Sequence, residues 1–141
     1  MIDIDNDLEF IDRYDKIDSL KDKIITDIFI SRYKDFILFK LENNENYLMY
    51  HEQDCCESVL IDEIHGDLSN IIGSKIIIAE EVEGEAPSVN DDYFESYTWT
   101  FYKLATIKGY VTIRWFGESN GYYSESVDIA KVKIKQSNSF K

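Results

Sequence analysis

Basic residues are scarce in this chain. Its 141 residues contain 15 lysines and arginines against 28 aspartates and glutamates, which gives a net charge of −13 at pH 7. The negative electrostatic potential of such a protein repels nucleic acid and anionic lipid unless a local basic patch overrides it. The longest basic cluster is the C-terminal KVKIKQSNSFK, where Lys131, Lys133 and Lys135 alternate with apolar residues, as on the solvent side of a strand. We therefore expect no direct binding of nucleic acid and favour a partner with a basic surface.

Long apolar runs and targeting signals are also missing. No segment approaches the ~18 apolar residues that a membrane-spanning helix needs. The N-terminus, MIDIDNDLEF, is acidic where a signal peptide would be basic and then apolar. These absences predict a cytoplasmic protein without membrane contact. In a reducing compartment, the only two cysteines, Cys55 and Cys56, are expected to be thiols rather than a structural disulfide.

Proline and glycine, which are common in linkers between domains, are few in this chain. It contains one proline and six glycines, and 44% of its 141 residues are hydrophobic. This is enough for one substantial core and too short for two ordinary domains. We expect a single domain over residues 1–141, acting as a monomer or a homodimer. Its predicted parts are an N-terminal helical segment (1–23), a β-rich core (24–135) and a tail (136–141).

The hydrophobic pattern has two periods. Residues 7–23, DLEFIDRYDKIDSLKDK, space their apolar side chains by three and four positions, which is typical of an amphipathic helix. From Ile24 onward the period is two, as in short strands separated by turns. In GYVTIRWFG, for example, Val111, Ile113 and Trp115 fall on one face of a predicted strand.

These patterns predict an α+β fold that is mainly β. We expect about seven or eight strands in a twisted antiparallel or mixed sheet, sandwich- or barrel-like, with the N-terminal helix beside it. One further short helix is expected in GDLSNIIG, where Asp67 can cap a single turn closed by Gly73. The acidic segment EGEAPSVNDDYFES, which holds the only proline, is predicted to be a solvated loop.

The stretch YHEQDCCESV contains both cysteines and one of the two histidines, so it is the first place to look for chemistry. Zinc could be held by His51, Cys55 and Cys56, with the distant His65 as a fourth ligand. Adjacent cysteines on extended backbone point to opposite faces, however, and recognised zinc sites leave two to four residues between paired cysteines. We expect no bound metal; if there is one, His51, Cys55 and Cys56 are the predicted ligands.

Two other interpretations of this stretch remain. A cysteine nucleophile could use His51 as its base, but no glycine elbow or anion-binding loop is present to stabilise an oxyanion. No phosphate-binding loop, dinucleotide fingerprint or hydrolase elbow occurs in the chain. We therefore expect no enzymatic activity and no cofactor. The interpretation we favour is structural: one cysteine fills the core beneath a turn that Gln53 and Asp54 hold by hydrogen bonds.

Several stretches together resemble a known family. YHEQDCCESV, GDLSNIIGS, AEEV and SYTWTFYKLATIKGYVTIRWFGESNGYYSESV are similar to a small domain of unknown function found largely in bacteriophages and prophages. The resemblance covers about residues 45–128, and His51, Asp54, Cys55, Cys56 and Glu57 match its motif. It implies a phage origin and does not imply a mechanism. His65 does not correspond to a position of that motif.

Taken together, these features predict a non-enzymatic phage protein that inhibits a bacterial defence complex, such as a CRISPR effector, as an acidic mimic of nucleic acid. The expected partner is a host protein or nucleoprotein complex with a basic surface. Alternatives are a zinc-binding regulator using His51, Cys55 and Cys56, and a sponge for a small signalling nucleotide. Such a sponge needs cationic groups around a pocket, for which Arg114, Lys103 and Lys108 are the obvious set.

The predicted binding surface has an acidic and an aromatic part. Acidic loop residues and a turn rich in tyrosine are both suited to contact a partner, the first through charge and the second through apolar anchoring. The candidate residues are Asp91, Asp92, Glu95, Glu118, Tyr122 and Tyr123.

Overall fold

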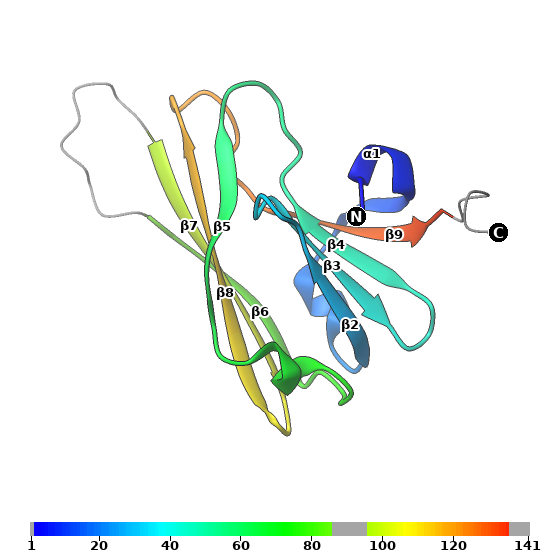
Figure 1. The fold of residues 1–141 in the computed structure, drawn as a ribbon. Coiled ribbons are helices and arrows are strands. Elements are labelled where there is room, and N and C mark those ends of the chain that lie inside the picture. The colour runs from blue at the N-terminus through cyan, green and yellow to red at the C-terminus, as the bar shows by residue number, and fades with distance from the viewer. Residues whose placement is uncertain (1, 86–95, 136–141) are drawn as a thin grey trace.

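Two antiparallel sheets make up the fold, which a computed structural model describes for residues 2–85 and 96–135 (Figure 1). The five-stranded sheet has the order β1-β9-β4-β3-β2, and the four-stranded sheet has the order β5-β8-β7-β6. The prediction of a mainly β, sandwich-like fold is confirmed, with nine strands in the described ranges. Their bounds are β1 (Leu8–Asp15), β2 (Ile25–Ile30), β3 (Phe36–Leu41), β4 (Asn46–Tyr50), β5 (Ser58–His65), β6 (Ile78–Glu85), β7 (Ser96–Thr106), β8 (Gly109–Ser119) and β9 (Asp128–Ile134).

The main core lies between the two sheets. Val111, Ile113 and Trp115, which share one face of β8 as predicted, are completely buried there. They form one apolar cluster with Ile37 and Met49 of the five-stranded sheet. The Trp115 indole N–H donates to the Met49 sulfur at 3.0 Å, so the only polar atom of this side chain also has a partner.

The predicted helix over residues 7–23 is wrong. The segment begins with the single turn α1 (Ile4–Asp7), continues as β1 (Leu8–Asp15) and ends with the 3-10 turn η1 (Ile17–Leu20). Ile11, which the helical spacing placed on the apolar face, is 58% exposed. Only the ends of the segment therefore provide buried apolar side chains.

Pairing with β9 explains why a strand forms here. Leu8 lies opposite Ile134 and Phe10 opposite Val132, and Glu9 faces Lys133 across the same pair of strands. Apolar and oppositely charged cross-strand pairs stabilise an antiparallel ladder. The aspartates of the segment are weak helix formers, so local propensity offers little competition to this pairing. Lys131 and Lys133 of β9 lie on the solvent side of the strand, as expected, and β9 pairs with β1 on one edge and with β4 on the other.

The second predicted helical turn is present. η2 (Leu68–Ile71) is a 3-10 turn whose N-cap Asp67 accepts the Ser69 N–H at 3.0 Å. Gly73 follows with φ +83°, a left-handed conformation that glycine adopts without strain. No helix in the part of the chain that the structure describes is long and apolar enough to cross a membrane.

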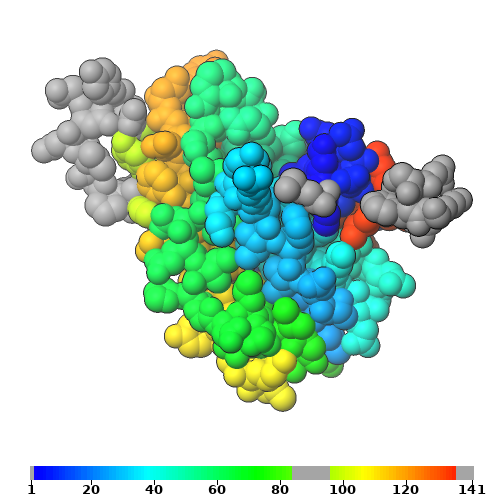
Figure 2. Space-filling model, in the orientation of Figure 1, coloured from blue at the N-terminus to red at the C-terminus, as the bar shows by residue number. Residues whose placement is uncertain are grey.

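Among the nine described strands, the chain passes from one sheet to the other twice. Residues 51–57 lead from β4 of the five-stranded sheet to β5 of the four-stranded sheet, and residues 120–127 lead from β8 back to β9. We call these the outward and the return crossover. They lie side by side at one end of the molecule, where Figure 2 shows the green and orange segments in contact. The outward crossover is the cysteine-containing stretch singled out from the sequence.

Candidate functional site

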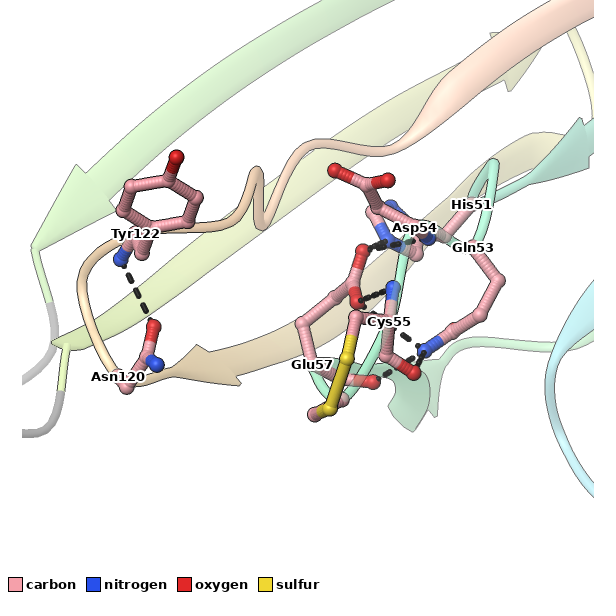
Figure 3. Close-up of a disulfide and its surroundings, with 8 residues drawn as sticks. His51, Gln53, Asp54, Cys55, Glu57, Asn120 and Tyr122 are labelled. Carbon is pink, nitrogen blue, oxygen red and sulfur yellow. Dashed lines mark hydrogen bonds and ion pairs between the residues drawn. A yellow bond between two sulfur atoms is a disulfide. The ribbon is translucent and has the colours of Figure 1, made fainter.

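The outward crossover is organised around the carboxylate of Glu57 (Figure 3). The side chain is completely buried, and its Oε2 accepts the Asp54 N–H at 2.9 Å and contacts His51 Nε2 at 2.8 Å. Its Oε1 accepts the Cys55 N–H at 2.8 Å and the Gln53 amide at 3.2 Å. Burial alone would raise the pKa of Glu57, but the hydrogen bonds from Cys55, His51 and Asp54 outweigh it and lower the pKa to about 2. Glu57 is therefore ionised at neutral pH.

His51 joins the two crossovers. Its Nδ1 lies 2.7 Å from the carbonyl oxygen of Ser126, while its Nε2 faces Glu57. The buried ring therefore bridges the Ser126 carbonyl of the return crossover and the Glu57 carboxylate of the outward crossover. A second link is made by the Glu52 N–H, which donates to the Asp128 carboxylate at 2.9 Å.

The cysteines do not occupy the core, so the structural interpretation is wrong for them. Both Cys55 and Cys56 are exposed and form a disulfide with each other, which also overturns the expectation of free thiols. The core position at this turn belongs to Glu57 instead, because its carboxylate satisfies backbone N–H groups that no cysteine could. The predicted role of Gln53 is confirmed, since its amide also donates to the Glu57 carbonyl at 2.7 Å; Asp54 takes part through its backbone N–H.

In this arrangement, the His51 nitrogens and the two cysteine sulfurs are not free to bind a metal ion or to act as base and nucleophile. The His51 nitrogens are both hydrogen-bonded, and the two sulfurs are bonded to each other. His65 is exposed on β5 and lies 3.7 Å from Glu63. Among residues 2–85 and 96–135, no group of three histidine, cysteine, aspartate or glutamate side chains is arranged to hold a metal ion.

The return crossover has a buried carboxylate of its own, which sequence reasoning missed. Glu125 accepts the Thr98 hydroxyl at 2.8 Å and the Ser119 hydroxyl at 2.5 Å. Gly117 of β8 lies directly beneath it, because a Cβ at that position would be 2.8 Å from the Glu125 carbonyl oxygen. Each crossover therefore has one buried glutamate: Glu57 holds the outward crossover together, and Glu125 attaches the return crossover to β7 and β8. A buried charge in a polar stretch has no sequence signature that would distinguish it from the exposed glutamates around it.

The predicted binding residues fall into two groups. Asp91, Asp92 and Glu95 lie outside the described residues. Glu118 is exposed at the end of β8, opposite Ser58, and is close in sequence to Tyr122 and Tyr123. Tyr122 is 84% exposed, and its ring meets that of Tyr123 edge-on, with centroids 5.2 Å apart. The structure thus brings Glu118 and the two tyrosines to the end of the molecule where the crossovers lie.

In the cationic set suggested for a nucleotide sponge, Arg114 and Lys103 lie on the outer face of the four-stranded sheet and Lys108 lies in the turn between β7 and β8. Each has its own partner. The Arg114 guanidinium stacks 4.7 Å from the Trp99 ring centroid and pairs with Asp62 and Glu63. Lys103 lies over the Tyr110 ring at 5.6 Å, and Lys108 donates to the carbonyl of Ile72. The cations are thus engaged separately and do not converge on a cavity.

An acidic groove runs along the open side between the two sheets. It has a volume of about 560 Å³ and lies where β1 and η1 approach β6 and the start of β9. At its side, the buried Tyr102 hydroxyl donates to Glu81, and burial together with this carboxylate raises the pKa of Tyr102. Five acids and two bases line the groove: Asp15, Asp18, Glu80, Glu81 and Asp128 with Arg13 and Lys16.

Fold and sites together define a β-sandwich domain with an apolar core between its two sheets and buried polar groups in the two crossovers that join them. The chain belongs to the family described as a domain of unknown function (DUF7448), whose model matches residues 18–129. The match contains both crossovers and begins after β1, so the N-terminal strand lies outside it. Comparison with curated proteins and with solved structures gives no match.

Proposed function

We propose that this protein is a non-enzymatic acidic inhibitor, encoded by a phage, that acts in the cytoplasm of a bacterial host. Its target is a host defence complex with a basic nucleic-acid groove, such as a CRISPR effector. The observation that carries the proposal is the acidic groove between the sheets, which has five carboxylates and two cationic side chains. In a chain of net charge −13, this surface suits the lysines and arginines that otherwise bind phosphates.

The arrangement of the acidic side chains supports this proposal. β6 is an edge strand, and its exposed Glu83 lies on the same face as Glu81, two residues further along the strand, where it extends the acidic surface. The segment that follows β6 in the chain holds the predicted contacts Asp91, Asp92 and Glu95. Glu118 and Tyr122 would add an anchor at the end of the same sheet, because exposed tyrosines are frequent energetic centres of interfaces.

Binding to purified CRISPR effector complexes across a salt series tests the proposal. Surface charges are screened beyond about 8 Å at physiological ionic strength, so affinity should fall steeply as salt increases. Asp18→Lys and Glu80→Lys reverse exposed charges of the groove and should each weaken binding; the triple change of Asp91, Asp92 and Glu95 to lysine should do the same.

Glu42→Lys is the matched control. Glu42 is exposed in the turn between β3 and β4, outside the acidic groove, and the substitution changes the net charge by the same amount. An effect of Glu42→Lys equal to that of Glu80→Lys would show that only net charge matters and would remove the groove from the proposal. Absence of binding to every complex, or binding that ignores both salt and charge reversal, would overturn the acidic-mimic function.

A further inference from the structure

The five-stranded sheet carries a second apolar cluster, against which residues of the N-terminal segment pack. Leu8, Phe36, Leu38, Leu48 and Tyr50 belong to it, with Ile2 and Ile4 packed against it from α1. Figure 2 shows α1, in dark blue, and the β2–β3 turn, in light blue, on the same face of the molecule. Between them is a groove of about 750 Å³, lined in part by Tyr50 at the end of β4 and by residues 51–53 of the outward crossover. This volume is in the range of sites for small molecules.

Aromatic rings form much of the groove. Phe10 and Tyr50 have ring centroids 5.6 Å apart, and Phe29 and Phe36 have centroids 5.8 Å apart. Tyr33 stands at the edge and is 74% exposed. A planar ring that enters the groove would contact these phenylalanine and tyrosine rings, including the exposed ring of Tyr33, and aromatic contacts of this kind favour stacking.

Arginine is concentrated at this groove. Two of the three arginines of the chain, Arg13 and Arg32, line it, and no lysine is among its described lining residues. The Arg13 guanidinium lies 3.9 Å from the Phe10 centroid and 3.5 Å from Glu52, in an ion pair that is half-exposed and therefore weak. Arg32 lies 5.9 Å from the Tyr33 ring and has no ion pair within the described residues. Guanidinium groups bind carboxylates and phosphates through paired hydrogen bonds.

Four carboxylates, those of Asp3, Asp5, Asp35 and Glu52, also line the groove, and three of them are engaged by the protein itself. Asp3 caps α1, accepting the Asp5 N–H at 3.0 Å and the Asn6 amide at 2.7 Å. Asp35 accepts the Ser31 hydroxyl at 2.6 Å, and Glu52 faces Arg13. A bound anion can therefore compete for Arg13 and take Arg32 without displacing a buried ion pair.

We propose that this groove is a binding site for a small aromatic anion, a planar ring that carries one phosphate or carboxylate. The ring stacks on the aromatic side chains, and the anionic group pairs with Arg32, which follows β2. Arg13 on β1, at the opposite edge of the sheet, adds a second positive charge to the groove. The site shares Arg13 with the acidic groove and no other described lining residue, and its ligand class is different from the macromolecular partner proposed above.

Nitrogen-15 NMR titration of the full chain tests the site. The probes are adenosine monophosphate and 4-hydroxybenzoate, with adenosine and inorganic phosphate as their partial counterparts. We expect at least one aromatic anion to bind more tightly than either partial probe and to shift the amides of Arg32, Tyr33 and Tyr50. Which of the two anions binds distinguishes a phosphate ligand from a carboxylate ligand.

Arginine variants localise the binding. Arg13→Gln and Arg32→Gln each remove an exposed guanidinium, so they should leave the spectrum folded and weaken binding about ten-fold or more. Arg114→Gln, on the other sheet, is the matched control and should leave the affinity unchanged. The proposal is overturned if neither anion binds at millimolar concentration, if the shifted amides belong to the four-stranded sheet, or if both groove variants bind like the unmodified protein.

Discussion

The close approach at Gly117 predicts the sign of a stability change. A Cβ at this position would lie 2.8 Å from the Glu125 carbonyl oxygen and 2.9 Å from the Glu125 Cβ, so the return crossover would have to move. If space were free, Gly117→Ala would stabilise the protein by about 0.4–1 kcal/mol, because alanine restricts the unfolded chain. Overpacking of this kind costs about 1–3 kcal/mol. We therefore expect a net loss of about 1–2 kcal/mol.

Thermal and urea unfolding measure this loss. For a chain of this size, the expected decrease in Tm is about 3–6 °C, and the slope of the free energy of unfolding against urea concentration should not change. Glu118→Ala, at the next position of β8 and facing solvent, is the control and should change the free energy of unfolding by less than about 0.5 kcal/mol. A Gly117→Ala protein as stable as the unmodified protein, or more stable, would refute the close packing of the return crossover on β8.

Two further predictions concern the outward crossover. The pKa of Glu57 is lowered from 4.5 to about 2, so its contribution to stability is present above about pH 4.5 and is lost as the pH falls toward 2. Glu57→Gln should therefore be less stable than the unmodified protein at pH 7. Between pH 4.5 and 2, its free energy of unfolding, measured by denaturant titration, should fall less than that of the unmodified protein. An equal pH dependence in the two proteins would contradict the buried carboxylate. Replacing both Cys55 and Cys56 by serine should change Tm by less than about 2 °C, because a bond between adjacent residues closes almost no chain and both side chains are exposed; a large decrease would show that the disulfide supports the crossover.

Period-two patterns predicted the strands because a sheet that is buried on one face repeats every two residues. Val111, Ile113 and Trp115 are an example, with alternation that no helix would produce. The N-terminal segment failed because Leu8, Ile11, Ile17 and Leu20 match the helical spacing by coincidence. The strand that contains Leu8 and Ile11 is set by pairing with β9, which is more than a hundred residues away in the chain, and a local window contains no information on that pairing.

Local hydrogen bonding was predictable only in part. Gln53 was assigned to the turn because a polar side chain next to tight backbone commonly satisfies it. The burial of Glu57 depends on the simultaneous approach of His51 and two backbone N–H groups, and that of Glu125 depends on Thr98 and Ser119 from other strands. Composition suggested that the cysteines were the buried residues, since free cysteine is usually apolar in behaviour. The geometry of the crossover instead requires a carboxylate.

The position of β9 has a consequence for synthesis of the protein. In the five-stranded sheet, β9 lies between β1 and β4, so β1 has no hydrogen-bonded neighbour until residues 128–134 have left the ribosome. The four-stranded sheet is built from consecutive segments and can form its hairpins earlier, because short-range contacts close at a lower entropic cost. Leu8 and Phe10 therefore remain exposed to solvent, without their strand partner, during most of translation. Ribosome-bound chains that stop before β9 should be the species most prone to aggregate or to recruit chaperones.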